Sequence, residues 1–212
     1  MEGSIARKMG RLVMNLAAHP RHLPRYIRDN TRHWLANATP LDLEIPWFSY
    51  AAMDMLESFL EPHMKAFEYG SGGSTIFLAK RVKAVLSVED NSVWFDIVSR
   101  RLHETGLSNV ELLLRPFDVK YPTGFESSEY FGALPDEMFD VLVIDGSEEW
   151  TQVRPACFRR AEERVNPGGI IVLDDSWRYH EPQRSNKARR VESFVSTGPC
   201  RPGVTSTDIF FY

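Results

Sequence analysis

Short apolar runs alternate along the chain with segments whose apolar residues recur every three or four positions. The short runs have the length and β-branched character of strands, and they cover residues 66–70, 84–90, 110–116, 139–146 and 169–176. The segments with helical spacing cover residues 74–82, 92–105, 151–165 and 187–196. Strands that alternate with helices are typical of a parallel sheet covered on both faces. We therefore predict an α/β fold with a doubly wound, mostly parallel sheet.

Both ends of the chain depart from this alternation. Before the first strand, helical spacing predicts three helices, over residues 4–18, 24–37 and 45–62. Pro46 suits the first turn of the third helix, and Pro62 ends it. Residues 197–212 have strand character, which predicts one antiparallel strand at the end of the sheet. We divide the chain into an N-terminal helical extension, residues 1–62, and an α/β domain, residues 63–212.

Composition and net charge are those of an ordinary globular protein. Of the 212 residues, 43% are hydrophobic and 25% are charged, and the net charge of -4 argues against binding to nucleic acid. Two cysteines, Cys157 and Cys200, are too few for a disulfide scaffold and fit a reducing compartment. No apolar run approaches the ~20 residues of a membrane-spanning helix, and no secretory signal is evident. We expect a cytoplasmic protein.

The first 40 residues carry an excess of positive charge that the rest of the chain lacks. Seven Lys or Arg and two Asp or Glu give them a net charge of +5, against -9 for residues 41–212. The first predicted helix places its apolar residues mostly on one face and its basic residues mostly elsewhere. Such a helix can lie on an anionic membrane surface, or it can pack against the domain or against a second copy of the chain. Peripheral membrane contact and homo-oligomer contact stay open as alternatives.

A glycine-rich stretch follows the first predicted strand. Gly70, Gly72 and Gly73 stand where a doubly wound sheet binds its ligand, and glycine permits close approach of the backbone. A dinucleotide fingerprint needs a third glycine where this chain has Thr75, and no Gly-Lys-Ser/Thr of a triphosphate-binding loop follows. The stretch therefore lacks both a pyrophosphate and a triphosphate signature.

Three acidic residues flank this loop. Glu89 ends the second predicted strand, 19 positions after Gly70, where a carboxylate can accept hydrogen bonds from a ribose diol. Asp90 is a second candidate for that role. Glu68 lies inside an apolar strand, where a carboxylate needs a partner, so it either orients the backbone N–H groups of the loop or meets a cationic ligand. The loop and the acids together indicate a nucleoside whose ribose hydroxyls are free.

Four motifs, in this order, resemble the class I S-adenosylmethionine-dependent methyltransferases. They are FEYGSGGST, SVEDN, FDVLVIDG and NPGGIIVLDDS, and the resemblance covers residues 64–212. It implies a Rossmann-like methyltransferase domain with a seven-stranded sheet that ends in an antiparallel hairpin. The implied cofactor, S-adenosylmethionine, is cationic at its sulfur and its ammonium group. Carboxylates therefore suit this loop, whereas phosphate-binding loops favour positive charge.

The resemblance also implies which residues bind the cofactor. Glu89 maps to the ribose-binding acid, Asp118 maps to the acid beside the adenine, and Asp145 maps to the motif that follows the fourth strand. The complete set of candidate cofactor-binding residues is Glu68, Gly70, Ser71, Gly72, Gly73, Ser74, Glu89, Asp90, Asp118 and Asp145.

Carboxylates also end the fourth and fifth predicted strands, at Asp145, Asp174 and Asp175. Neighbouring strand ends bring such residues together, and Mg²⁺ takes oxygen clusters of this kind. The pattern partly resembles the metal-dependent, catechol-type O-methyltransferases, in which a metal lowers the pKa of the acceptor hydroxyl, although Asp175 stands where that family has Asn. The alternative is that Asp174 and Asp175 make only structural hydrogen bonds. We assign catalytic roles to Asp145, Asp175 and His180, the last as a general base.

These observations predict transfer of a methyl group from S-adenosylmethionine to a hydroxyl oxygen of a small-molecule acceptor. Candidate walls of the acceptor pocket are the aromatic residues Trp47, Tyr50, Trp150 and Trp177. Two alternatives remain, an NAD(P)-dependent oxidoreductase, against which Thr75 counts, and a non-catalytic nucleoside-binding or membrane-docked protein. The identity of the acceptor does not follow from the fold.

Overall fold

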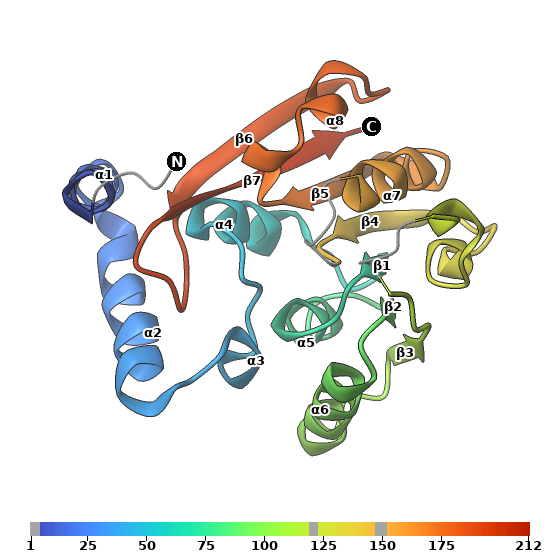
Figure 1. The fold of residues 1–212 in the computed structure, drawn as a ribbon, viewed down its shortest axis with the longest axis horizontal. Coiled ribbons are helices and arrows are strands. Elements are labelled where there is room, and N and C mark those ends of the chain that lie inside the picture. The colour runs from blue at the N-terminus through green and yellow to red at the C-terminus, as the bar shows by residue number, and fades with distance from the viewer. Residues whose placement is uncertain (1–4, 119–122, 147–151) are drawn as a thin grey trace.

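The centre of the molecule is a sheet of seven strands. In this computed structural model, which describes residues 5–118, 123–146 and 152–212, the strands are β1 Lys65–Tyr69, β2 Ala84–Glu89, β3 Val110–Leu114, β4 Phe139–Ile144, β5 Val165–Asp174, β6 Arg190–Thr197 and β7 Val204–Phe211. Their order is β3-β2-β1-β4-β5-β7-β6 (Figure 1). β1 to β5 pair in parallel, whereas β7 pairs antiparallel with β5 and β6. The predicted seven-stranded sheet with its antiparallel end is confirmed.

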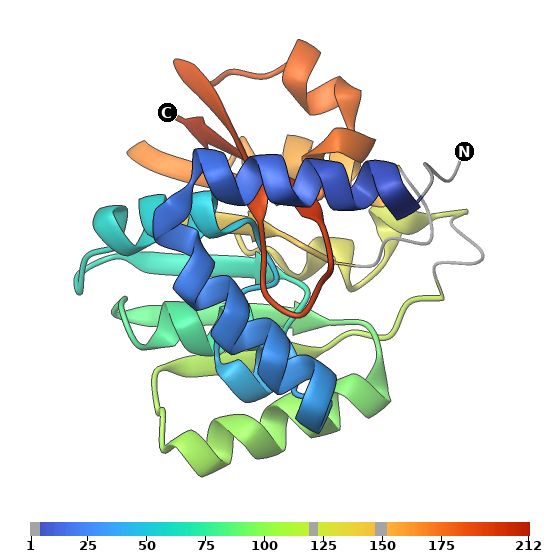
Figure 2. The ribbon, with the colours of Figure 1, turned by 90° about the vertical axis from the view of Figure 1, so that its left-hand side faces the viewer.

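Helices lie on both faces of the sheet, which confirms the doubly wound arrangement (Figure 1). The described helices are α1 Ile5–Ala18, α2 Leu23–Ala36, α3 Pro40–Leu43, α4 Tyr50–Phe59, α5 Gly73–Ala79, α6 Ser92–Thr105, α7 Val153–Ala161 and α8 His180–Arg184. Single 3₁₀ turns cover Pro20–His22, Phe125–Ser127, Phe131–Ala133 and Ser176–Arg178. α4 and α5 cover one face and α7 covers the other, while α1 and α2 lie across one side of the molecule (Figure 2).

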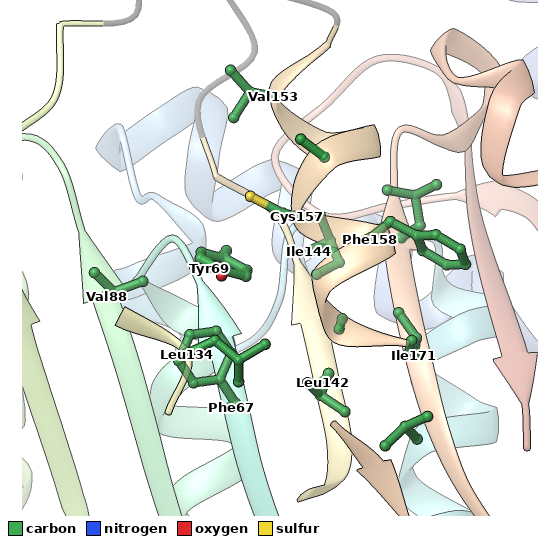
Figure 3. Close-up of a cluster of buried hydrophobic side chains, with 14 of the residues drawn as sticks. Phe67, Tyr69, Val88, Leu134, Leu142, Ile144, Val153, Cys157, Phe158 and Ile171 are labelled. Carbon is green, nitrogen blue, oxygen red and sulfur yellow. The ribbon is translucent and has the colours of Figure 1, made fainter. Parts of the chain in front are cut away.

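Two hydrophobic clusters hold these layers together, because the central strands are apolar on both faces. On one side, Phe158 of α7 packs with Ile144 of β4 and Ile171 of β5 (Figure 3). On the other side, Met53 of α4 belongs to the same cluster as Val143 of β4. β4 is therefore buried on both faces from Val141 to Ile144.

The helix predicted over residues 187–196 is wrong, because this segment forms strand β6. β6 pairs with β7 along its whole length, from Arg190 opposite Phe211 to Thr197 opposite Val204. The apolar spacing in this segment also fits a helix, but its β-branched residues and the available partner strand favour the extended form. The chain consequently ends in a hairpin.

Other boundaries also differ from the predicted ones. The helix predicted over residues 45–62 begins only after Ser49, whose hydroxyl accepts a backbone N–H of the first turn at 3.2 Å, so Pro46 precedes the helix. The strand predicted over residues 169–176 begins earlier, at Val165, and its register against β4 shifts between Phe139 and Val141. The start of the helix predicted over residues 151–165 lies outside the described residues.

Polar contacts dock the N-terminal helices on the sheet. The buried carboxylate of Asp29 in α2 accepts hydrogen bonds from Tyr50 Oη at 2.9 Å and from Arg28 Nε at 2.7 Å. In α1, the side-chain oxygen of Asn15 accepts the N–H of Thr197 in β6 at 3.0 Å. α4 precedes the predicted domain boundary, yet it packs in the core of the sheet. The division of the chain at that boundary stays a prediction.

The outer surface of the N-terminal helices is partly apolar. The large exposed apolar side chains on α1 and α2 are Met9, Val13, Met14, Leu23, Ile27, Trp34 and Leu35. Contact of this surface with a membrane, or with a second copy of the chain, stays a prediction. Within the described ranges, no helix combines the length and the hydropathy that crossing a bilayer requires.

We expect Tyr50→Phe to lower the free energy of unfolding by about 1–3 kcal/mol, because it removes a hydrogen bond to the buried carboxylate of Asp29. The matched control is Tyr26→Phe, since the buried hydroxyl of Tyr26 has no hydrogen-bond partner among the described residues. The control variant should be as stable as the wild type or more stable. Urea denaturation measures the difference, and equal effects of the two substitutions would show that this contact does not anchor α2.

Candidate functional site

A cavity of about 1530 Å³ opens at the carboxyl ends of the strands. Its wall follows the order of the sheet, with Glu89 at the end of β2, residues 70–74 after β1, Asp145 after β4 and Asp174 at the end of β5. Residues of β7, β6 and α1 close the far end. Doubly wound sheets bind their ligands at this edge, so this cavity is the candidate site.

The glycine-rich loop, residues 70–74, forms the wall beside β1. Gly70 has a φ of +97°, and a Cβ there would lie 2.8 Å from the carbonyl oxygen of Asp145. Gly73 is the first residue of α5, and a Cβ there would overlap the carbonyl oxygen of Pro40. Both positions therefore require glycine, the first for its conformation and its close neighbour, the second for space alone.

Thr75, which stands where a dinucleotide fingerprint has its third glycine, connects the loop to Glu68 by hydrogen bonds. Its hydroxyl accepts the N–H of Gly72 at 2.9 Å and donates to Glu68 Oε2 at 2.6 Å. Glu68 is fully buried and is not among the residues that line the cavity. Of its two predicted roles, the geometry favours orientation of the loop over contact with a ligand.

Burial raises the pKa of Glu68 to about 7, and hydrogen bonds from Ser74, Thr75 and Ser87 limit the rise. The hydroxyl of Ser87 has one proton but lies within reach of two acceptors, Glu68 Oε2 at 3.0 Å and the carbonyl oxygen of Gly70 at 2.7 Å. A protonated Glu68 satisfies both groups, since it can donate to Ser87 while Ser87 donates to Gly70. The neutral carboxyl group therefore suits this buried network.

Glu89 lines the cavity with both carboxylate oxygens engaged. Oε2 accepts the hydroxyl of Ser71 at 2.6 Å, and Oε1 accepts the N–H of Asn91 at 3.0 Å. Burial raises the pKa of Glu89, and these two hydrogen bonds oppose the rise. Asp90 and Trp94 lie in the same wall, and the Trp94 indole donates to the carbonyl oxygen of Ser71 at 2.9 Å. Trp94 is not among the residues predicted from the sequence, although its place in the first turn of α6, just after Glu89, is a usable signal.

A buried arginine of α7, Arg154, joins the carboxyl ends of β4 and β5. Its Nε donates to the carbonyl oxygen of Gly146 at 2.9 Å, and its Nη1 donates to the carbonyl oxygen of Asp174 at 2.8 Å. Its Nη2 lies 3.1 Å from Asp145 Oδ1, and its side chain is only 2% exposed. Arg154 is not among the residues predicted from the sequence, because arginine in a helix is ordinarily a surface residue.

Asp174 is buried at the end of β5 and accepts the hydroxyl of Thr207 at 2.6 Å. Burial raises its pKa to about 8, and the neighbouring carboxylates of Asp145 and Asp175 add to the rise. A carboxyl group with this pKa can take up and release a proton near neutral pH. From the sequence, Asp174 is predicted either as a metal ligand or as a group that makes only structural hydrogen bonds, and not as a group that exchanges a proton.

Asp175 follows β5 in the left-handed conformation, with a φ of +48°. Its Oδ1 accepts the hydroxyl of Thr205 at 2.8 Å and lies 3.6 Å from Arg201 Nη1. Its Oδ2 lies 3.8 Å from Arg178 Nη2. Asp175 is therefore held by a hydroxyl group and flanked by two guanidinium groups.

The Mg²⁺ site predicted at Asp145, Asp174 and Asp175 is not supported. In the part of the chain that the structure describes, no three His, Cys, Asp or Glu side chains are grouped so as to hold a metal ion. Guanidinium groups stand beside Asp145 and Asp175, where a cation would bind, and Asp174 has a pKa that favours its protonated form. These carboxyl groups therefore fit hydrogen bonding and proton transfer better than coordination of a hard cation.

Two other candidates lie away from the cavity wall. Asp118 is exposed after β3, and His180 is exposed at the start of α8. Neither is among the described residues that line the cavity. The structure brings together the loop, Glu89 and Asp145, and it leaves the adenine-side acid and the general base predicted from the sequence outside that group.

Two of the candidate aromatic residues line the cavity. They are Trp47, whose indole donates to the carbonyl oxygen of Pro199 at 2.9 Å, and Trp177. Tyr50 is buried in α4 and does not line the cavity, and Trp150 lies outside the described residues. Aromatic surface is thus available at the end of the cavity farther from Glu89.

Comparison with known proteins gives a match within the α/β part of the chain. Residues 67–176 match the family model of a methyltransferase domain. The matched segment begins in β1 and ends just after β5, so it contains the glycine-rich loop and every strand end that carries an acid of the cavity wall. No curated protein matches the chain.

Solved structures share the fold at low sequence identity. A protein from Klebsiella pneumoniae described as an O-methyltransferase has a TM-score of 0.61 at 16% identity, over 97% of this chain and 98% of its own. The O-methyltransferase TomG of Streptomyces achromogenes, solved with S-adenosylmethionine, has a TM-score of 0.57 at 15% identity, over 87% of each chain. An rRNA methylase from Streptococcus thermophilus has a TM-score of 0.56 at 15% identity, over 76% of this chain and 93% of its own. At these identities the likeness shows the fold alone.

We expect the wild type to lose stability, relative to Glu68→Gln, as the pH rises from 4.5 to about 7. The folded state holds the Glu68 proton more tightly than the unfolded chain, so its stabilisation is complete below the unfolded pKa and is lost as the pH passes the folded pKa. The full effect is about 3 kcal/mol. Urea denaturation of both proteins at about pH 5 and about pH 8 measures it. Parallel pH dependences would show that Glu68 is ionised throughout.

Proposed function

Because this chain belongs to the methyltransferase-domain family, as a class I, S-adenosylmethionine-dependent enzyme with a Rossmann-like fold, we propose that it methylates a hydroxyl oxygen of a small-molecule acceptor. One observation carries the proposal, namely the carboxyl group of Asp174, whose raised pKa suits it to accept the hydroxyl proton. Family membership counts against an NAD(P)-dependent oxidoreductase and against a non-catalytic nucleoside-binding protein.

The cofactor is proposed to lie over the glycine-rich loop, between β1 and β2. The ribose hydroxyls donate to Glu89, which Ser71 and Asn91 hold in place. The backbone of residues 70–74 lines the cavity and would contact the methionine part of the cofactor. The carboxylate of Asp145, after β4 on the other side of β1, would stabilise the positive charge of the sulfonium group.

The reaction needs an acceptor oxygen in line with the methyl–sulfur bond. A bond forms between this oxygen and the methyl carbon, the carbon–sulfur bond breaks, and S-adenosylhomocysteine leaves with a neutral sulfur. The hydroxyl proton passes to the carboxylate of Asp174. We place the proton on Asp174 rather than on Asp175, because Arg178 and Arg201 flank Asp175 and stabilise its charged form.

A small molecule is the proposed acceptor, although one protein of similar fold is an rRNA methylase. The chain has a net charge of -4, and a nucleic-acid-binding surface favours an excess of positive charge. A cavity of about 1530 Å³ can hold both a cofactor and a small acceptor. Nucleic acid is therefore not proposed as a partner.

We expect S-adenosylhomocysteine to bind the wild type and to bind Glu89→Gln about 10-fold more weakly, because the amide offers one acceptor oxygen in place of two. The matched control is Glu111→Gln, on the exposed side of β3 and outside the cavity wall. Isothermal titration calorimetry measures both affinities. Equal affinities for the two variants would place the ribose elsewhere, and failure of the wild type to bind would contradict the proposed function.

Methyl transfer to oxygen should yield a methyl ether. Incubation with S-adenosylmethionine that carries a ¹³C-labelled methyl group, and with a panel of hydroxylated small molecules, produces a labelled carbon whose chemical shift distinguishes O-methyl from N-methyl and S-methyl. We expect Asp174→Asn to lower kcat about 100-fold or more while S-adenosylhomocysteine affinity is kept. The wild-type rate should rise with pH through about 8, as Asp174 loses its proton. A methylamine product, or full activity of Asp174→Asn, would contradict this assignment.

A further inference from the structure

Basic side chains of the N-terminal helix line the end of the cavity that lies farthest from Glu89. Arg7, Lys8 and Arg11 of α1 stand there, beyond β5, β7 and β6 in the order of the sheet. The contact between Asn15 and β6 fixes α1 in this position, and Figure 1 shows α1 beside the hairpin of β6 and β7. The N-terminal helix therefore forms part of the wall opposite the proposed ribose site.

These three cations have no hydrogen-bond or ion-pair partner within the described ranges, in contrast to Arg21 and Arg28 of the same N-terminal segment. Arg21 pairs with Asp54 at 3.3 Å, and Arg28 pairs with Asp29 at 2.7 Å. Arg7 and Arg11 are four residues apart, so they share one face of α1 and repel each other. Unpaired cations that converge on one cavity attract an anion.

The acids nearest to this end do not cancel that charge. Asp175 lies between Arg178 and Arg201, so it is already matched by two positive groups. Asp174 is buried with a raised pKa, which favours its uncharged form. The end of the cavity beside α1 consequently has an excess of positive charge. The end beside β2, which Glu89 and Asp90 line, is acidic.

Resting on the proposed function, we propose that the small-molecule acceptor carries a carboxylate or phosphate group, which Arg7, Lys8 and Arg11 bind. Arginine binds either anion through two parallel N–H groups, and lysine adds a point charge. Held by its anionic end at α1, the acceptor extends past Trp177 and presents its hydroxyl to Asp174. The N-terminal helix is thus a specificity element of the same cavity.

The surface of α1 favours a small anion over a nucleic acid. The three cations line the cavity, whereas Met9, Val13 and Met14 are exposed on the same helix, at 48%, 61% and 67%. A nucleic-acid backbone would need positive charge spread over the outer surface, where this helix presents apolar side chains. The charge of α1 instead borders the cavity.

The test measures binding of two anion probes, pyrophosphate and citrate, to full-length protein saturated with S-adenosylhomocysteine. Isothermal titration calorimetry at fixed ionic strength gives both affinities. We expect wild-type protein to bind both probes. The triple variant Arg7→Gln, Lys8→Gln, Arg11→Gln should bind them about 10-fold more weakly, with unchanged affinity for S-adenosylhomocysteine.

A matched control separates a local site from net charge. The triple variant Lys83→Gln, Arg100→Gln, Arg189→Gln removes the same charge from exposed positions outside the cavity. This control should bind both probes as the wild type does. Because all six positions are exposed, neither triple variant removes a buried contact, and thermal unfolding checks that both are folded.

Several outcomes overturn the proposal. One is that the wild type binds neither probe. Another is that both triple variants bind the probes equally weakly. Weaker binding of S-adenosylhomocysteine to the α1 variant would show that the cations hold the cofactor carboxylate instead. A single-stranded RNA that binds only through these residues, without binding of the small anions, would identify a nucleic-acid acceptor. If the wild type binds S-adenosylhomocysteine but no anion, only this inference fails, and the proposed function stands.

Discussion

The buried guanidinium group of Arg154 is the interaction on which the site depends. It spans from α7 to the carboxyl ends of β4 and β5, where it binds two carbonyl oxygens and the carboxylate of Asp145. Without it, these acceptors would be crowded together with too few donors, and unsatisfied buried acceptors cost free energy. Arg154 therefore holds the carboxylate of Asp145 beside the carbonyl oxygens of Gly146 and Asp174.

The same interaction lets two neighbouring acids differ in chemistry. Asp145 is paired with the cation of Arg154, whereas Asp174 bonds through its carboxyl group to Thr207 and has a raised pKa. Environments that separate two carboxyl groups in this way are common where one must stay charged and the other must exchange a proton. In the proposed reaction, the first stabilises the cationic cofactor and the second takes the proton of the acceptor.

The overall fold could be predicted from the sequence because it depends on local signals. Short apolar runs, the glycines after β1 and the acids at strand ends each mark a place in the sheet, and the sheet order brings these places to one edge. The helix predicted over residues 187–196 is wrong, because the apolar spacing there suits a helix and only pairing with β7 makes the segment a strand.

The details of the site depend on contacts between residues far apart in the sequence, and the sequence could not predict them. Three acids at strand ends suggest a metal site, but Arg201 from the β6–β7 connection stands beside Asp175, and Arg154 stands beside Asp145. A hydrogen bond to the loop after β1 positions Trp94 in the cavity wall. Tertiary packing determines which side chain lies beside each carboxylate. Residue type and spacing alone therefore left both metal binding and structural hydrogen bonding open.

A crystal structure of the complex with S-adenosylhomocysteine tests the central claim most directly. The account predicts that the ribose hydroxyls lie within hydrogen-bond distance of Glu89, that the sulfur faces Asp145, and that the volume between Asp174 and the N-terminal helix stays open for an acceptor. A nucleoside bound away from Glu89, or a sulfur that faces away from Asp145 and Asp174, would contradict it.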